Sequence, residues 1–80
     1  MNRDDIDLLK KVTLLGILHK KPNENLNDIQ VMLVETGMYT KKEAKQIFKL
    51  LKEEKFLVEG ELSVKGITEA KMAEAMFRQQ

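Results

Sequence analysis

The segment from Tyr39 to Leu57, YTKKEAKQIFKLLKEEKFL, constrains the fold more than any other part of this 80-residue chain. At about 100° per residue, a helix over this segment places Ala44, Ile47 and Leu51 on one side. The same winding gathers a set of lysines on another side: Lys41, Lys42, Lys45, Lys49 and Lys52. The pattern predicts a helix with one face in a hydrophobic core and a row of ammonium groups in solvent.

Short-range signals predict where this helix begins. Thr40 can cap the first turn, and Glu43 three residues later completes a capping box. Gly37 lies where a preceding helix would end in the left-handed conformation. We therefore expect a tight turn followed by a helix over residues 40–54.

Two further helices are expected before that turn. The first contains a broad apolar face between Ile6 and Leu18, and Gly16 within it suggests a close helix crossing. Asn23 or Asn25 can cap the second helix. The residues expected on its buried side are Leu26, Ile29, Met32 and Leu33.

A short hairpin and a last helix are expected after residue 55. The runs 56–58 and 61–63 suit strands of about three residues, and Glu59-Gly60 between them suits a tight turn. Ser63 can cap a helix that runs to roughly Arg78. Its expected inward residues are Ile67, Ala70, Ala73 and Phe77. The predicted fold is one domain over residues 1–80, mainly α with a short β-hairpin.

Composition argues against several functional classes. The chain has no cysteine, and His19 is its one histidine, so we expect no metal site, cofactor or disulfide. We expect no membrane span, because no apolar run reaches about 18 residues. A small core leaves little room for a catalytic pocket, so we expect no enzyme. The expected location is cytoplasmic.

The positive charge is concentrated on one element, although the whole chain carries only +1. Residues 38–57 hold six lysines against three glutamates, whereas acids slightly outnumber bases in residues 1–37 and 58–80. A basic helix beside a turn indicates a surface for a polyanion, and an ordinary solvated helix face is the alternative.

The order of these elements resembles the winged helix-turn-helix architecture. The stretch from Leu50 to Ala70, LLKEEKFLVEGELSVKGITEA, is similar to small regulators of the MarR-like and PadR-like kind. In those proteins a recognition helix is followed by a hairpin, and a pattern L-[ST]-x-x-G opens the next helix. Here the residues Leu62-Ser63-Val64-Lys65-Gly66 match that pattern. The resemblance implies a three-helix core, a minimal wing and a C-terminal helix.

The resemblance also implies a function in binding double-stranded DNA, as a transcriptional regulator with residues 40–54 as its recognition helix. The lysines would hold phosphates, Gln46 and Thr40 would lie nearer the bases, and Tyr39 could donate to a phosphate. The expected DNA-facing residues are Tyr39, Thr40, Lys41, Lys42, Lys45, Gln46 and Lys49.

Two alternatives concern partners. Met72, Met76 and Phe77 could form a homodimer contact, or they could only complete the monomer core. The chain could also be a winged-helix adaptor that binds a protein and no DNA, because Glu59 and Glu61 make the expected wing acidic.

Overall fold

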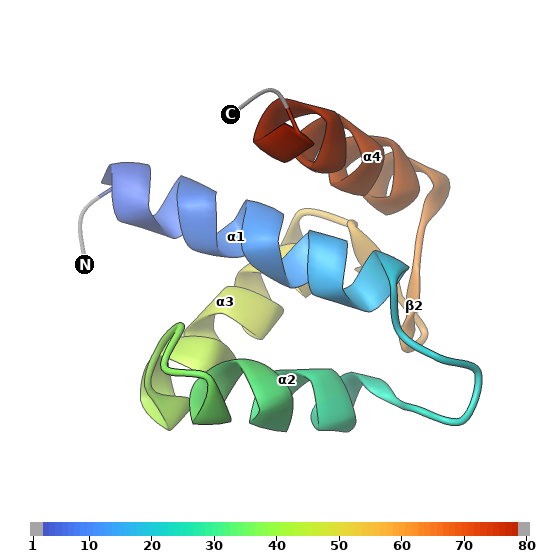
Figure 1. Ribbon diagram of the computed structural model, residues 1–80. Helices are drawn as coiled ribbons and strands as arrows, with labels where there is room; N and C mark the ends of the chain where they lie inside the picture. The colour runs from blue at the N-terminus through green and yellow to red at the C-terminus, as the bar shows by residue number, and fades with distance from the viewer. Residues whose placement is uncertain (1–2, 79–80) are drawn as a thin grey trace.

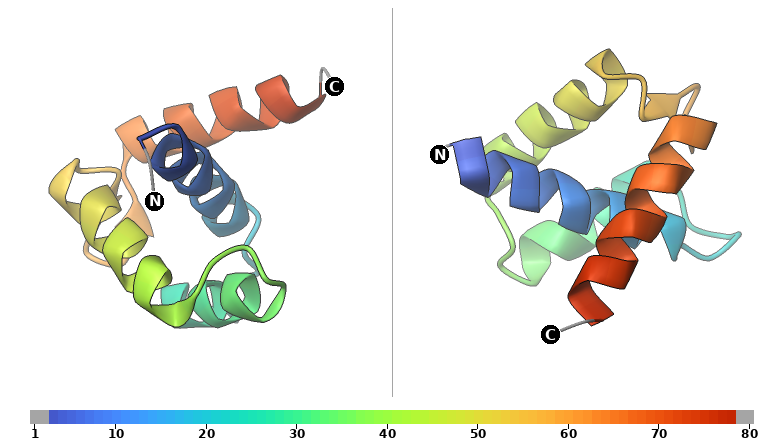
Figure 2. Two further views of the ribbon diagram at one scale, coloured as in Figure 1. Left: turned by 90° about the vertical axis from the view of Figure 1, so that its left-hand side faces the viewer. Right: turned by 90° about the horizontal axis from the view of Figure 1, so that it is seen from above.

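The computed structural model describes residues 3–78, which form four helices and one small hairpin. The elements follow the chain in the order α1 Arg3–Leu18, α2 Leu26–Glu35, α3 Lys41–Glu53, β1 Leu57–Val58, β2 Glu61–Leu62 and α4 Val64–Arg78. Helix α1 lies between α4 on one side and α2 on the other, with α3 behind it (Figure 1). Helix α4 packs mainly against α1 and leaves the outer side of α3 uncovered (Figure 2). No helix within residues 3–78 is long and apolar enough to cross a bilayer.

One hydrophobic core lies where α1, α2 and α3 meet, and it extends to β1 and α4. Its buried members are Leu14, Ile17, Ile29, Leu33, Tyr39, Ala44, Ile47, Phe48, Leu51, Leu57 and Ala70. The expected crossing at Gly16 is present, because a Cβ added there would lie 3.4 Å from Cγ2 of Ile29 in α2. Three expected core residues are exposed instead: Leu8 at 48%, Met32 at 42% and Ile67 at 36%. Each lies beside the side of its helix that packs against the core, because the buried side of each helix is narrower than its set of apolar residues.

The predicted helix caps are confirmed. Asn25 accepts a hydrogen bond from the backbone N–H of Asp28, and the Asp28 carboxylate accepts one from the N–H of Asn25. Gly37 ends α2 with φ +84°, in the left-handed region that favours glycine. Ser63 Oγ accepts from the N–H of Gly66 at 3.0 Å and so caps α4. Each of these bonds joins residues three apart, which is why the local sequence predicts them.

The hairpin is present but its strands are two residues long, shorter than expected. Leu57 pairs with Leu62 and Val58 with Glu61 in antiparallel register. Glu59 and Gly60 both have positive φ, at 53° and 81°, as a two-residue type I′ turn requires.

The Leu62–Gly66 segment attaches the hairpin and α4 to the end of α3. Ser63 Oγ donates to the carbonyl of Lys55 at 2.6 Å, and Ser63 N–H donates to the carbonyl of Phe56 at 3.0 Å. Gly66 is buried, and a Cβ added there would lie 2.2 Å from the same Phe56 carbonyl oxygen. The glycine therefore permits the close approach of α4 to the chain that leaves α3.

Replacing this glycine should be costly. We expect Gly66→Ala to lower the free energy of unfolding by about 1–3 kcal/mol, because the new methyl overlaps backbone. Gly16→Ala is the matched control: it makes ordinary contact with Ile29 and should raise stability by up to about 1 kcal/mol. Urea denaturation of both variants measures the difference. Equal effects of the two substitutions would contradict this role for Gly66.

Candidate nucleic-acid interface

Helix α3 begins at a complete capping box. Thr40 Oγ1 accepts from the backbone N–H of Glu43 at 3.1 Å, and the Glu43 carboxylate accepts from the N–H of Thr40 at 2.9 Å. The hydrogen bonds from the Thr40 backbone and side chain lower the pKa of Glu43 below its usual value. The prediction that Thr40 caps this helix is confirmed, so Thr40 has a structural role whether or not it contacts a ligand.

The two sides of α3 differ sharply in burial. Ala44, Ile47 and Leu51 are 0% exposed, and Phe48 is buried beside them. The polar side is exposed along the whole helix: Lys41, Lys42, Lys45, Gln46, Lys49 and Lys52. Because the apolar side is anchored in the core, the lysine row has one fixed orientation toward solvent. Lys52 lies in this row, where the sequence placed it, although it was not among the residues expected to face DNA.

Two of the three acids of the α3 region are bound by groups outside the lysine row. Glu43 takes part in the capping box. Glu54 pairs with Lys10 of α1 at 2.5 Å. Glu53 lies 4.0 Å from Lys49, and the side chains of Glu53 and Lys49 are both exposed. An exposed pair at that distance contributes little. Within residues 3–78, the ammonium groups of Lys41, Lys42, Lys45 and Lys52 have no carboxylate within ion-pair distance. The acids therefore compensate little of the positive charge on this face.

Tyr39 does not belong to this face, and its expected role toward DNA was wrong. Its side chain is 6% exposed and packs in the core. Its hydroxyl lies 3.0 Å from Oγ1 of Thr13, a buried residue of α1. Thr13 Oγ1 donates its one proton to the carbonyl of Leu9, so the Tyr39 hydroxyl donates to Thr13. Tyr39 therefore holds the turn before α3 against α1.

The other end of α3 is held by two cations that the sequence did not single out. Lys65 Nζ donates to the carbonyl of Glu54 at 2.9 Å and lies 4.7 Å from the ring centre of Phe56. Lys10 lies 5.8 Å from the same ring while it pairs with Glu54. These contacts are cation–π and charge-assisted interactions between α1, α4 and the end of α3. The L-[ST]-x-x-G pattern contains Lys65, but its contact with Phe56 depends on the tertiary structure.

The hairpin beside α3 carries the opposite charge. Glu59 and Glu61 are both exposed, on its turn and on β2. Carboxylates at these positions would repel a phosphate backbone. The basic surface is therefore restricted to α3 and does not continue onto the hairpin.

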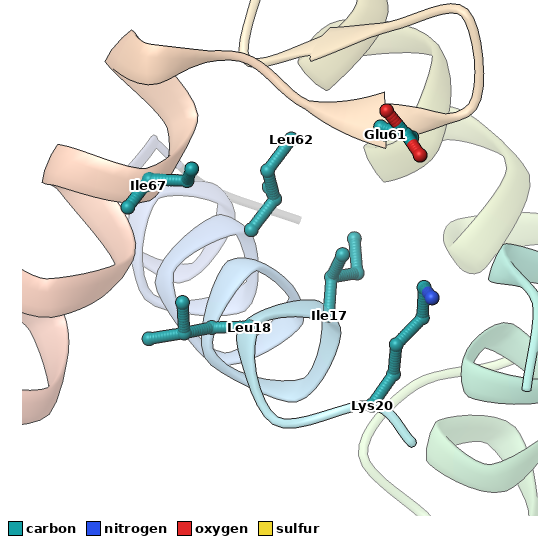
Figure 3. A pocket seen from close by; sticks show the side chains of 6 residues that line it. All are labelled: Ile17, Leu18, Lys20, Glu61, Leu62 and Ile67. Carbon is teal, nitrogen blue, oxygen red and sulfur yellow. The ribbon is translucent and has the colours of Figure 1, made fainter. Parts of the chain in front are cut away.

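A separate hollow of about 310 Å³ lies at the end of α1, beside β2 and the start of α4 (Figure 3). Its lining residues are Ile17, Leu18, Lys20, Glu61, Leu62 and Ile67. Among residues 3–78, no three histidine, cysteine, aspartate or glutamate side chains gather as metal ligands. Four apolar side chains line the hollow together with the opposite charges of Lys20 and Glu61.

The three residues expected at a dimer contact differ in exposure. Met72 is 60% exposed and Met76 is 39% exposed, whereas Phe77 is half-buried. Met72 and Met76 line a hollow of about 350 Å³ between α1 and α4. These two methionines therefore remain available to a partner.

The buried Tyr39 hydroxyl should be visible in the pH dependence of stability. Burial raises the pKa of Tyr39 above its ordinary 10.0, although the hydrogen bond with Thr13 lowers it in part. The unfolded chain then loses this proton at lower pH than the native protein, so the tyrosine's contribution to stability falls as pH rises above 10.0. Tyr39→Phe lacks that dependence and should be less stable by about 1 kcal/mol at neutral pH. Urea titrations of both proteins from neutral to alkaline pH test this, and parallel curves would contradict it.

Comparison of the chain with protein-family models, with curated proteins and with solved structures finds no match.

Proposed function

We propose that this protein is a small winged-helix protein that binds double-stranded DNA and acts as a transcriptional regulator, with α3 as its recognition helix. The order of two helices, a turn, a basic helix, a hairpin and a last helix supports the winged-helix assignment. The observation that carries the proposal is the exposed lysine row of α3, whose apolar side is fixed in the core.

The dimensions of α3 suit the major groove. It has 13 residues and is therefore about 20 Å long. A major groove about 12 Å wide admits one helix. Lys41, Lys45, Lys49 and Lys52 recur at intervals of three or four residues, so at least one ammonium is present on each turn. In this arrangement the lysines neutralise phosphates on the walls of the groove.

Gln46 is the residue of this face best suited to read a base. It is exposed, and its neighbours three or four residues away on the helix include Lys42 and Lys49. A glutamine amide can donate to N7 and accept from the N6 amino group of adenine at the same time. The lysines would contribute affinity, and Gln46 would contribute sequence preference.

Reversing charge in the lysine row should abolish most of the binding. We expect Lys45→Glu with Lys49→Glu to weaken binding to duplex DNA at least about tenfold at about 50 mM salt. Lys21→Glu with Lys71→Glu is the matched control, because it makes the same charge change at exposed positions outside α3. Fluorescence anisotropy with a labelled duplex measures both. The wild-type affinity should fall with salt at a logarithmic slope of about −0.9 for each phosphate contacted.

Removing the Gln46 amide should change the preference for particular DNA sequences more than the overall affinity for duplex DNA. We expect Gln46→Ala to lose about 1–3 kcal/mol of binding free energy on the DNA sites that the wild type prefers, and little on other sites. Selection of binding sites from a random duplex library, carried out with the wild type and with Gln46→Ala, measures the change. A uniform loss across all sequences would show that Gln46 reads no base.

A second candidate function is favoured by the acidic hairpin. Glu59 and Glu61 are exposed next to a basic helix, a pairing that suits a winged-helix adaptor bound to a protein with both charges on its surface. Absence of duplex binding by the folded wild-type protein at about 50 mM salt would favour the adaptor over the regulator.

A further inference from the structure

We infer that the hollow between the end of α1, β2 and the start of α4 binds a free α-amino acid with an apolar side chain. The hollow has a volume of about 310 Å³, at the lower end of the range of small-molecule sites. Such sites are lined mainly by apolar side chains and contain a few polar groups that orient the ligand. The lining of this hollow has that composition, with four apolar and two charged side chains: Ile17, Leu18, Leu62, Ile67, Lys20 and Glu61.

The charged and the apolar side chains are separated along the hollow. Lys20 and Glu61 lie at one end of it, and Leu18 and Ile67 lie at the other (Figure 3). An α-amino acid has the same polarity, because its carboxylate and its ammonium share one carbon atom and its side chain extends away from them. The matching orientation places the charged groups of the ligand between Lys20 and Glu61, and its side chain toward Leu18 and Ile67.

The apolar part of the hollow is built on fixed elements. Ile17 is 4% exposed and belongs to the core. Leu62 packs against that core and pairs with Leu57 in the hairpin. Ile67 is 36% exposed, and its backbone N–H donates to the carbonyl of Ser63 in the first turn of α4. An apolar ligand would remove the exposed part of Ile67 from water, and a surface fixed in advance loses little entropy on binding.

The two charges of the hollow lack partners in the folded chain. Within residues 3–78, neither Lys20 nor Glu61 has an ion pair, with the other or with any further residue. His19 beside Lys20 is bound to Glu74 instead. Lys20 is half-buried, where an ammonium without a partner is less stable than in open solvent. A zwitterion supplies both partners, since its carboxylate binds Lys20 and its ammonium binds Glu61.

The same pair of charges disfavours other apolar ligands. A fatty acid or an aromatic carboxylate would bind Lys20 but would bring its own negative charge toward Glu61. An apolar amine would bind Glu61 and approach Lys20 with like charge. Only a ligand with both charges is attracted by both residues, so the hollow selects for a zwitterion.

This inference does not depend on DNA binding. None of the residues that line the hollow belongs to α3 or to its lysine row. Amino-acid binding is measured without DNA, so its failure is distinct from failure of the DNA-binding proposal.

Titration of the isotope-labelled full chain with L-leucine and with L-phenylalanine, followed by NMR, tests the binding. We expect saturable shifts of the backbone amides of the residues that line the hollow. N-acetyl-L-leucine lacks the ammonium, L-leucinamide lacks the carboxylate and glycine lacks the side chain, so each should bind at least about tenfold more weakly than leucine. No saturable shift with either amino acid up to about 20 mM, or equal binding of any of these three compounds, would overturn the inference.

Removal of either charge from the protein tests the assignment of the two residues. Lys20→Gln and Glu61→Gln should each weaken leucine binding at least about tenfold. In Glu61→Gln, leucine and N-acetyl-L-leucine should bind equally, because the group that distinguishes them is absent. Lys21→Gln with Glu59→Gln is the matched control, since both residues are exposed neighbours in the sequence that lie outside the hollow.

The control variant should bind leucine like the wild type, and circular dichroism verifies that each variant is folded. Wild-type affinity in Lys20→Gln or in Glu61→Gln would overturn the inference. The same loss of affinity in the control variant would also overturn it, because the effect would then be one of general charge.

Discussion

Burial of one side of α3 is the constraint on which the rest of this structure depends. Ala44, Ile47 and Leu51 are completely excluded from solvent, in the space between α1 and α2. Rotation of α3 about its axis would expose these residues and bury lysines, and an unpaired buried ammonium is far more costly than an exposed one. The direction of the lysine row is therefore a result of core packing, and the hydrophobic effect determines where the charged surface lies.

The ends of α3 are held as firmly as its middle. At its start, the Thr40 cap and the Tyr39–Thr13 hydrogen bond connect the turn to α1. At its end, Glu54, Phe56 and Lys65 connect it to α1 and α4. A charged face on a rigid support loses little entropy when it binds, which is an advantage for any polyanion ligand. The same contacts use Glu43 and Glu54, which would otherwise reduce the positive potential of the helix.

Two surfaces of this small molecule differ in chemical character. The α3 face is basic and polar, whereas the Met72/Met76 side of α4 is apolar with one charge of each sign. Helix α1 lies between α4 and α2 and contacts all three other helices, so the apolar side and the basic face rest on one core.

The sequence by itself determined the local features of this protein. The caps at Thr40 and Ser63, the left-handed Gly37 and the Glu59-Gly60 turn were all predicted, because each depends on groups a few residues apart. For α2 the sequence left Asn23 and Asn25 as alternatives, and the structure selects Asn25. The amphipathic pattern also predicted which side of α3 would be exposed, because burial on a helix repeats every three or four residues. Only the tertiary structure decided that Tyr39 is buried, because its hydrogen-bond partner is 26 residues away. It also decided that Met32 is exposed, because Met32 lies just outside the side of α2 that packs against the core. The contacts of Lys10 and Lys65 with the Phe56 ring, and the close approach of Gly66 to the Phe56 carbonyl, also depend on how the helices pack. No local sequence pattern predicts them.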